Sequence, residues 1–362
     1  MNKNIKLINL VLGSYEEFNL VIYNESKEYM PIFEDICIQI NLKNIIYLYT
    51  DEDDYLKKKI AHMQCCYIGK GILRTLILNN IKTKNFLTTT TNLNKYQLKK
   101  SKFCNNYCYI FHSLVSINKA YEDKAFHSYD TIFAPTINHV VELNKYKNIH
   151  NLNSNILKSG YPLIDKISQT KFNNDKNDHT KILLAPSWGN NNFFTFNYVK
   201  ILKDILQNTK YQITLRPHPH YYRKNKKKIL KKLDELKIYK NFKLSIKYNF
   251  NDLTENEILI SDMSGITIEF FLLNKLKIIY LDDSLKVKNE NFASIASTTL
   301  EERIKKKIGI RVSTNQLSTF LKDFNKDDIL LNKEVINQTT DIIGLYNFKK
   351  SAKSIIDYLE NN

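Results

Sequence analysis

Short apolar runs, each followed by a polar turn and a helix-like segment, alternate along the second half of this chain. The clearest run, Ile258–Ile260, leads through Ser261-Asp262-Met263-Ser264-Gly265 into an apolar helical stretch. Alternation of this kind is typical of α/β folds with mostly parallel sheets. The pattern predicts strands at Lys181–Ala185, Gln212–Leu215, Leu244–Ile246, Ile258–Ile260 and Lys277–Leu281, and helices near 197–207, 222–237 and 267–273.

The first half shows the same alternation less clearly. It predicts strands at Leu20–Tyr23, Ile45–Tyr49, Phe86–Thr90, Tyr107–His112 and Thr131–Ala134, with helical segments at Ser26–Leu42 and Ile137–Tyr146. Because 362 residues exceed the usual length of one domain, we expect two lobes. The polar stretch 171–180 has no apolar periodicity and is interpreted as a linker. The expected organisation is therefore a lobe at 1–170, a lobe at 181–345, and a final helical segment at 346–362 that crosses back to the first lobe.

The chain is strongly basic, with 54 Lys and Arg against 37 Asp and Glu and a net charge of +17. Such an excess attracts polyanions, which include nucleic acid, anionic membranes and phosphate-bearing substrates. The basic segment Arg223–Lys232 offers a contact for an anionic membrane surface, although a solvated helix face explains it as well. No RNA-binding signature interleaves the aromatic residues with Gly and basic residues, so we expect no nucleic-acid partner.

The five cysteines are odd in number and unevenly spaced, which argues against a disulfide framework and for a reducing compartment. Cys104 and Cys108 lack two further ligands at zinc-type spacing, so no metal site is expected there. We also expect no cofactor. No apolar run reaches the roughly 20 residues that a membrane-spanning helix needs. The sequence therefore predicts a cytoplasmic protein, with peripheral attachment to the inner face of the membrane left open.

Arg216-Pro217-His218-Pro219 follows the expected strand Gln212–Leu215 directly. Ligands of doubly wound sheets bind beyond the carboxyl ends of the strands. The two prolines fix φ and remove backbone donors, which makes the turn rigid. Arg216 offers a planar fork to phosphate oxygens, and His218 can donate a hydrogen bond or a proton to a leaving phosphate. The alternative is a rigid strand exit whose charges only face water.

The segment from Ser261 to Gly265 has the same place after its own strand. Backbone N–H groups at the start of the following helix, together with the hydroxyls of Ser264 and Thr267, would form a pocket for a pyrophosphate. The alternative is ordinary capping, with Ser264 as the N-cap residue. Both readings use the same geometry, so the segment indicates a phosphate site only together with the preceding motif.

His112 ends the expected strand Tyr107–His112 and opens a polar segment. Loops at this position deliver side chains to a ligand site, and a neutral imidazole near pH 7 is a suitable general base. The alternative is a strand-end histidine whose ring hydrogen-bonds a neighbouring carbonyl group.

Together, these motifs resemble the C-terminal nucleotide-binding lobe of the CDP-glycerol glycerophosphotransferases, the polymerases and primases of teichoic acid and capsule. The resemblance covers roughly residues 86–282 and does not extend to the first eighty residues. Its further elements are Ile110–Leu114, Tyr129–Thr136, Ser159–Pro162 and Leu183–Trp188. With the strand pattern, it indicates an α/β fold of two Rossmann-like lobes of the glycosyltransferase-B type, with a cleft between them. The resemblance implies that the N-terminal lobe at 1–170 binds the acceptor and that the C-terminal lobe at 181–345 binds the nucleotide donor.

The resemblance also implies roles for individual residues. His112 would remove the proton from the acceptor hydroxyl, while Arg216 and His218 would bind the donor pyrophosphate and stabilise the departing CMP. The implied substrate-binding residues are Arg216, Ser264, Gly265, Thr267, Glu269 and Ser187. Two positions depart from the family pattern: Ser113 replaces a glycine, and Gly265 replaces a serine and so lacks its hydroxyl.

The predicted function is transfer of glycerol phosphate, or a related polyol phosphate, from a CDP-linked donor to a hydroxyl of a surface polymer or a lipid-linked primer. One alternative keeps the fold and changes the chemistry to that of a capsule or lipooligosaccharide glycosyltransferase using a CMP-activated or other nucleotide-activated sugar. Another is a non-catalytic basic protein that binds nucleic acid or membrane. The sequence does not decide the transferred group, the acceptor, or priming against polymerisation.

Overall fold

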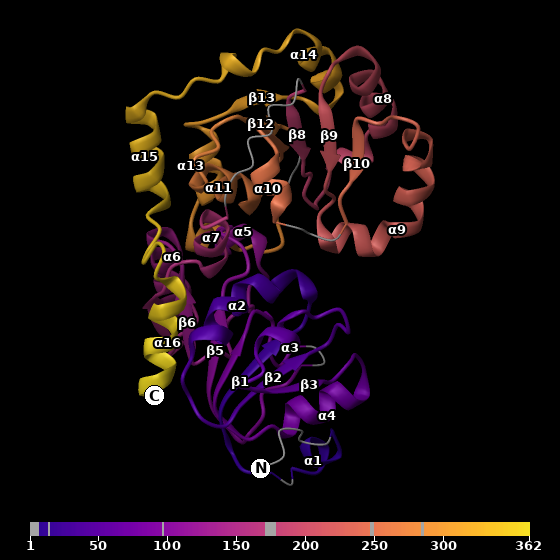
Figure 1. Cartoon of the computed structure of the whole chain (residues 1–362). Helices are drawn as coiled ribbons and strands as arrows, with labels where there is room; N and C mark the ends of the chain where they lie inside the picture. The colour runs from indigo at the N-terminus through magenta and orange to yellow at the C-terminus, as the bar shows by residue number, and fades with distance from the viewer. Residues whose placement is uncertain (1–6, 14, 96–97, 171–178, 247–249, 284–285) are drawn as a thin grey trace. The chain divides into compact units, whose positions relative to one another are not determined.

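The structure, a computed structural model, describes residues 7–13, 15–95, 98–170, 179–246, 250–283 and 286–362. The chain forms two compact units, each of which is described by itself (Figure 1). Unit 1 comprises Met1–His112, Tyr121–Lys166 and Gly344–Asn362, and unit 2 comprises Ser113–Ala120 and Ile167–Ile343. Most of the expected linker, residues 171–178, lies outside the described residues.

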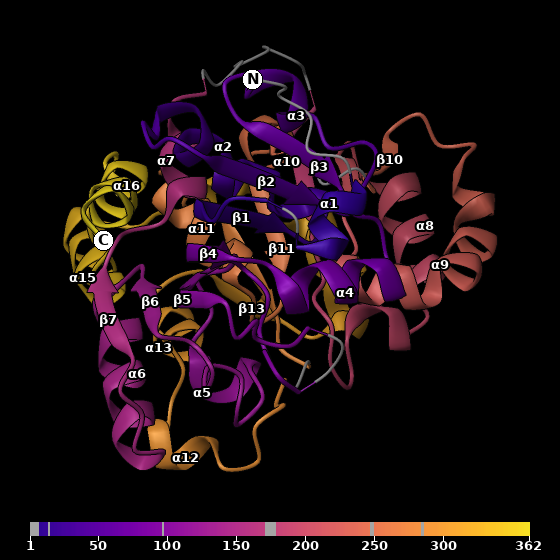
Figure 2. The same cartoon turned by 90° about the horizontal axis from the view of Figure 1, so that it is seen from below.

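A seven-stranded sheet forms the centre of unit 1, and its strands pair in parallel. Figure 2 shows the strands side by side in the order β3-β2-β1-β4-β5-β6-β7. Every residue of β2 and β6 is buried, as expected for a parallel sheet that is covered on both faces. The strands are β1 (Phe18–Asn24), β2 (Ile45–Tyr49), β3 (Gln64–Tyr67), β4 (Thr83–Thr88), β5 (Cys104–Ile110), β6 (Thr131–Ala134) and β7 (Asn155–Lys158).

Unit 1 contains a helix from the far end of the chain. This helix, α16 (Ser351–Asn361), packs against α2 (Met30–Gln39). The buried Asp165 carboxylate fixes its start, because it accepts hydrogen bonds from the N–H groups of Lys349 at 2.7 Å and Ser351 at 2.8 Å. The other helices that begin in this unit are α1 (Leu7–Leu12), η1 (Lys27–Tyr29), α3 (Leu56–Lys59), α4 (Ile72–Asn80), α6 (Ile137–Ile149) and α7 (Pro162–Ser168).

Gly160 allows the chain to pass close to this C-terminal segment. Its φ of +81° lies in the left-handed region, and a Cβ at this position would approach the Tyr346 carbonyl oxygen and the Ser351 Oγ to 2.4 Å. A residue with a side chain would therefore be strained and would also collide with its neighbours.

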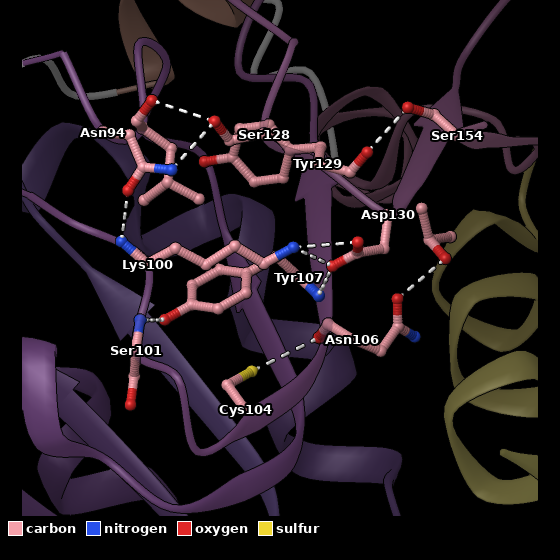
Figure 3. A network of polar contacts seen from close by, with 12 residues as sticks. Asn94, Lys100, Ser101, Cys104, Asn106, Tyr107, Ser128, Tyr129, Asp130 and Ser154 are labelled. Atoms are coloured by element: carbon pink, nitrogen blue, oxygen red, sulfur yellow. Dashed lines mark hydrogen bonds and ion pairs between the residues drawn. The ribbon is translucent and has the colours of Figure 1, made fainter. Parts of the chain in front are cut away.

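A polar network joins the turns that lead into β5 and β6 (Figure 3). The Asp130 carboxylate accepts from the Lys100 ammonium at 2.6 Å and from the Tyr107 N–H at 2.8 Å. The Tyr107 hydroxyl in turn accepts from the Ser101 N–H at 2.7 Å. Asp130, the residue that precedes β6, thus holds the middle of β5 and the turn that leads into it.

Unit 2 is built on a six-stranded parallel sheet with the order β10-β9-β8-β11-β12-β13. Its central strands β8, β11 and β12 are apolar and almost wholly buried. The strands are β8 (Lys181–Leu184), β9 (Gln212–Leu215), β10 (Phe242–Leu244), β11 (Ile258–Ser261), β12 (Ile278–Leu281) and β13 (Ile310–Val312).

Helices surround this second sheet. They are α5 (Ile117–Ala120), η2 (Phe193–Thr195), α8 (Tyr198–Asn208), α9 (Pro219–Leu233), η3 (Asp234–Leu236), α10 (Asn251–Glu255), α11 (Gly265–Leu272), α12 (Phe292–Ile295), α13 (Leu300–Lys305), η4 (Thr314–Gln316), α14 (Leu317–Asp323), η5 (Lys326–Asp328) and α15 (Lys333–Ile343). In the basic helix α9, Ile229 and Leu233 are buried, whereas Leu230 is 38% exposed. Across the described residues, no helix has both the length and the apolar character needed to cross a bilayer.

Unit 2 also includes a short segment, Ser113–Ala120, that stands in sequence between β5 and β6 of unit 1. The Ser116 N–H donates to the buried Glu301 carboxylate at 3.1 Å, and the Leu300 N–H donates to the Ser116 Oγ at 2.6 Å. Lys119 forms an ion pair with Glu302 at 2.6 Å. These bonds explain why the segment groups with unit 2, although the sequence pattern assigned it to a continuous lobe at 1–170.

The predicted fold class is confirmed, because both sheets are parallel and alternate with helices. Strands β3, β7 and β13 escaped the sequence pattern, and β10 begins two residues before the expected strand at Leu244–Ile246. Helix α9 starts at Pro219, three residues earlier than expected. The strand expected to end at His112 ends at Ile110 instead.

Candidate functional site

Three strand ends of unit 2 are tied together beyond their carboxyl edge. The N–H of Arg216 donates to the Leu184 carbonyl at 2.8 Å, and the N–H of His218 donates to the Pro186 carbonyl at 3.2 Å. On the other side, the Ser261 hydroxyl donates to the Ala185 carbonyl at 2.6 Å. The loops after β8, β9 and β11 therefore lie side by side. This is the edge at which parallel α/β sheets bind ligands.

The Arg216 side chain is 13% exposed and is positioned by two neighbours. One guanidinium nitrogen lies 4.0 Å from the Asp252 carboxylate, and the guanidinium carbon lies 5.9 Å from the centre of the Phe250 ring. Asp252 is itself held by the Ser245 hydroxyl, which donates to it at 2.5 Å. These contacts restrict the guanidinium, so its planar fork, which is suited to bidentate hydrogen bonds, has a fixed orientation.

His218 has a structural role at the start of α9. It is the N-cap residue of α9, and its Nδ1 accepts a hydrogen bond from the His220 N–H at 3.3 Å. The neutral ring consequently carries its proton on Nε2, which is a hydrogen-bond donor. Capping by itself would not need a histidine, since Ser, Thr, Asp and Asn are the preferred residues at this position. The neighbouring His220 is largely exposed, and partial burial together with the nearby Lys224 ammonium lowers the pKa of its imidazole.

Ser187 and Asp262 form the buried base of this edge. Both are 1% exposed, and the Ser187 N–H donates to both Asp262 carboxylate oxygens at 3.1 and 3.2 Å. The Ser187 Oγ is buried and has no hydrogen-bond partner among the described residues. Asp262 lies in the segment Ser261–Gly265, but the sequence did not predict it as a site residue. The signal that identifies it is a carboxylate directly after a buried strand.

Helix α11 begins at the segment for which the sequence left capping and phosphate binding open. Ser264 is the N-cap residue, but its side chain makes no capping hydrogen bond. The Thr267 hydroxyl donates to the Ser264 carbonyl at 2.7 Å, so its single proton is used within the helix. In the structure this hydroxyl stabilises the turn, and its contact with phosphate stays a prediction. Glu269 lies on the same helix and is 8% exposed.

Gly265, the first residue of α11, lies directly against Ser113. A Cβ on Gly265 would come within 2.4 Å of the Ser113 Oγ and within 3.3 Å of the Leu114 nitrogen. The two positions that depart from the family pattern are thus neighbours within unit 2. A hydroxyl at 113 occupies the space that a side chain at 265 would take.

Lys286 is a cation of this edge that the sequence did not reveal. It is 8% exposed, its ammonium donates to the Met263 carbonyl at 2.9 Å, and it lies 5.3 Å from the centre of the Trp188 ring. Burial lowers its pKa, and the carboxylates of Asp262 and Glu301 oppose this effect. One lysine in a chain with 54 Lys and Arg carries no distinguishing sequence signal.

His112 belongs to unit 1 and is its last residue before the segment Ser113–Ala120. The imidazole is half-buried, with its centre 4.6 Å from that of the Tyr29 ring and 6.3 Å from that of the Tyr121 ring. Its role as a base stays a prediction.

Within the described part of the chain, no cluster of three or more His, Cys, Asp or Glu side chains could hold a metal ion. The two cysteines considered as ligands are buried, and burial raises the pKa of Cys104 to about 12 and that of Cys108 well above its usual value.

The parallel α/β sheets of the two units, with helices between successive strands, have the architecture of glycosyltransferase-B enzymes. Over residues 117–291 the sequence matches the family described as CDP-Glycerol:Poly(glycerophosphate) glycerophosphotransferase. This match confirms the resemblance that the motifs predicted and supports a transferase of this type. The match includes Arg216, His218, Ser264 and Gly265.

Solved structures share the fold at low sequence identity. The structure of the wall teichoic acid polymerase TagF has a TM-score of 0.61 and 16% identity, with 95% of this chain and 88% of that chain covered. A UDP-GlcNAc 2-epimerase from Methanocaldococcus jannaschii has a TM-score of 0.57 and 15% identity, with coverage of 95% and 99%. MnaA from S. aureus, solved with UDP, has a TM-score of 0.56 and 10% identity, with coverage of 95% and 96%. No curated protein matches the sequence significantly.

Proposed function

We propose that this protein transfers glycerol phosphate, or a related polyol phosphate, from a CDP-linked donor to a hydroxyl of a polymeric or lipid-linked acceptor. The observation that carries the proposal is the set of cations and hydrogen-bond donors at the carboxyl edge of unit 2. There, Arg216 and Lys286 supply cations and His218 supplies an Nε2–H donor, all within the stretch that matches the family model.

The chemistry follows from these groups. The acceptor hydroxyl loses its proton to the His112 imidazole, its oxygen bonds to the β-phosphorus, and the bond from that phosphorus to the bridging oxygen breaks. CMP leaves with the negative charge that develops on this oxygen. Arg216 and the His218 Nε2–H neutralise that charge, and Lys286 adds to the positive field. Phosphoryl transfer depends mainly on positioning and electrostatic stabilisation of this kind.

In the same proposal, Ser187, Ser264 and the Gly265 N–H bind the donor phosphates. Helix starts favour anions through their exposed N–H groups and the helix dipole. The buried Ser187 Oγ is a donor near Asp262 that a phosphate oxygen would satisfy. The Glu269 carboxylate contacts the ribose of the donor.

A donor screen tests the function. Thermal shifts of the full chain are compared for CDP-glycerol, CDP-ribitol, CMP-sialic acid and UDP-sugars, and products are then identified with the donor that stabilises most. We expect stabilisation by a CDP-polyol and formation of phosphodiester linkages. Glycosidic linkages from a CMP-sugar would refute the proposal in favour of a glycosyltransferase. Salt-sensitive RNA binding without donor turnover would favour a non-catalytic protein.

A further inference from the structure

The solvent side of helix α9 carries a dense set of lysines that the function proposed above leaves unassigned. The helix buries Tyr222, Ile229 and Leu233 in unit 2, which fixes its rotation about its own axis. Successive residues are about 100° apart around an α-helix, so the side opposite these buried residues is occupied by basic residues. We call this side the lysine face, and its exposed residues are Lys224, Lys227, Lys228 and Lys231.

The lysine face has no negative partner in the part of the chain that the structure describes. Helix α9 itself contains no Asp or Glu. The acidic residues that follow it, Asp234 and Glu235, pair with Lys237 and Lys203 instead. None of the lysines of the face forms an ion pair with a described carboxylate. Because like charges three or four residues apart destabilise a helix, a bound polyanion would relieve their repulsion.

The spacing of these charges suits a linear chain of phosphodiesters. Lysines four residues apart on this face, such as Lys224 and Lys228, are about 6 Å apart along the helix axis. Six covalent bonds separate neighbouring phosphorus atoms in a chain of glycerol phosphates, and they span at most about 7 Å, since the three backbone bonds of a residue span at most about 3.6 Å. Successive phosphates of such a chain can therefore each meet a lysine.

The composition of the lysine face favours such a polymer over a membrane or a single-stranded nucleic acid. Helices that lie in a membrane interface bury an apolar stripe in the lipid, whereas the apolar stripe of α9 packs within unit 2. Proteins that bind single strands supply aromatic side chains on which the bases stack, and the sequence from Arg223 to Lys232 contains no aromatic residue. Flexible lysines on a convex surface also need a ligand that presents several charges at once.

We propose that the lysine face of α9 binds the anionic polyol-phosphate chain that the reaction lengthens, a few repeats from its reacting end. Helix α9 begins directly after His218, and Lys224 follows about 9 Å further along the axis. A chain whose end lies at the carboxyl edge of unit 2 therefore reaches the lysine face within about two repeats. The inference rests on the proposed function for the identity of the chain, whereas the binding itself does not require turnover.

The test measures binding of oligo(glycerol phosphate) chains of defined length, from a dimer to an octamer, to the full chain by isothermal titration calorimetry at low salt. The lysine-face variant combines Lys227→Gln, Lys228→Gln and Lys231→Gln. Its dissociation constant for the octamer is expected to be about tenfold higher or more, because most of the charged contacts are lost. Glutamine has nearly the helix propensity of lysine, so we expect the circular dichroism spectrum to be unchanged.

The control variant makes the same charge change elsewhere in unit 2 and combines Lys306→Gln, Lys307→Gln and Lys333→Gln. These exposed lysines lie at the end of α13 and the start of α15, toward the β13 end of the sheet, whereas α9 lies toward the β10 end (Figure 1). We expect its affinity for the octamer to stay within about twofold of the wild type.

Chain length provides a second measurement that needs no variant. Since the lysine face is about 10 Å long, the affinity of the wild type should rise from the dimer to the tetramer and then level off. A dissociation constant that does not change between the dimer and the octamer would overturn the proposal, and so would equal octamer affinities of the wild type and the lysine-face variant.

Two further probes identify other occupants of the lysine face. Tighter binding of a single-stranded RNA of equal charge than of the octamer would overturn the proposal in favour of a nucleic-acid surface. A loss confined to phosphatidylglycerol vesicles in the lysine-face variant would overturn it in favour of a membrane surface. Octamer binding that depends on the lysine face, without use of any CDP-polyol, would sustain this inference and refute the proposed function. Turnover of a CDP-polyol with unaltered octamer binding in the variant would do the reverse.

Discussion

The close contact between Gly265 and Ser113 leads to a prediction whose size can be worked out. Gly265→Ala places a Cβ 2.4 Å from the Ser113 Oγ, well inside the 3.0 Å that Cβ atoms keep from other heavy atoms, and 3.3 Å from the Leu114 nitrogen. The hydroxyl can rotate away, but the Leu114 backbone cannot. Overpacking of this kind costs about 1–3 kcal/mol, and the movable hydroxyl favours the lower half of that range.

A second substitution isolates the cause. Ser113→Gly removes the Oγ, so the Cβ of the double variant meets only the contacts at 3.3 Å. We therefore expect the double variant to lose about 1 kcal/mol less unfolding free energy than the sum of the losses in the two single variants, because the two residues share one contact. The same double change with serine at 265 restores the arrangement of the related family.

The assay is urea unfolding followed by the fluorescence of Trp188, which is the only tryptophan of the chain and lies in unit 2. The signal therefore reports the unit in which both substitutions lie. If Gly265→Ala leaves the unfolding free energy unchanged, or if the two single effects add within about 0.5 kcal/mol, the packing of Ser113 on the start of α11 is refuted.

Four further outcomes are expected. His218→Ala should reduce turnover by roughly two to four orders of magnitude while circular dichroism stays native; near-normal activity would remove His218 from the mechanism. Asp262→Asn should destabilise unit 2 by about 1–3 kcal/mol in the same urea assay, since one of its oxygens becomes a donor facing the Ser187 N–H. Lys286→Met should weaken CDP-donor binding about tenfold in titration calorimetry, and unchanged binding would exclude a phosphate role. Burial lowers the pKa of Lys275 to about 8, so above that pH the folded state binds fewer protons than the unfolded state. The unfolding free energy of the wild type should therefore rise between pH 8 and 9.5 relative to that of Lys275→Met. Parallel pH dependence of the two unfolding free energies would contradict this.

The sequence predicted the inner strands well and missed the outer ones. β3, β7 and β13 are edge strands of their sheets, and each contains exposed or half-buried positions. An edge strand is paired on one side only and buries less surface, so its sequence lacks the continuous apolar run that marks a central strand. The strand shifted from its expected place, β10, is also an edge strand.

Some residues of the candidate site could likewise be predicted from the sequence, and others could not. Arg216 and His218 were predictable because a rigid proline turn follows an apolar strand, and that relation is local in sequence. Lys286 and the contact between Ser113 and Gly265 depend on residues far apart in the chain. Only the packed structure brings these groups together, and no periodicity or motif encodes that packing.

The grouping of Ser113–Ala120 and of Gly344–Asn362 has a consequence for how the protein is made. The chain passes between the units four times, after His112, Ala120, Lys166 and Ile343. During synthesis, the sheet of unit 1 is complete long before α16 emerges from the ribosome to cover it. Neither unit can therefore be produced as one continuous fragment. Part of the core of unit 1 stays exposed to chaperones until α16 has been translated.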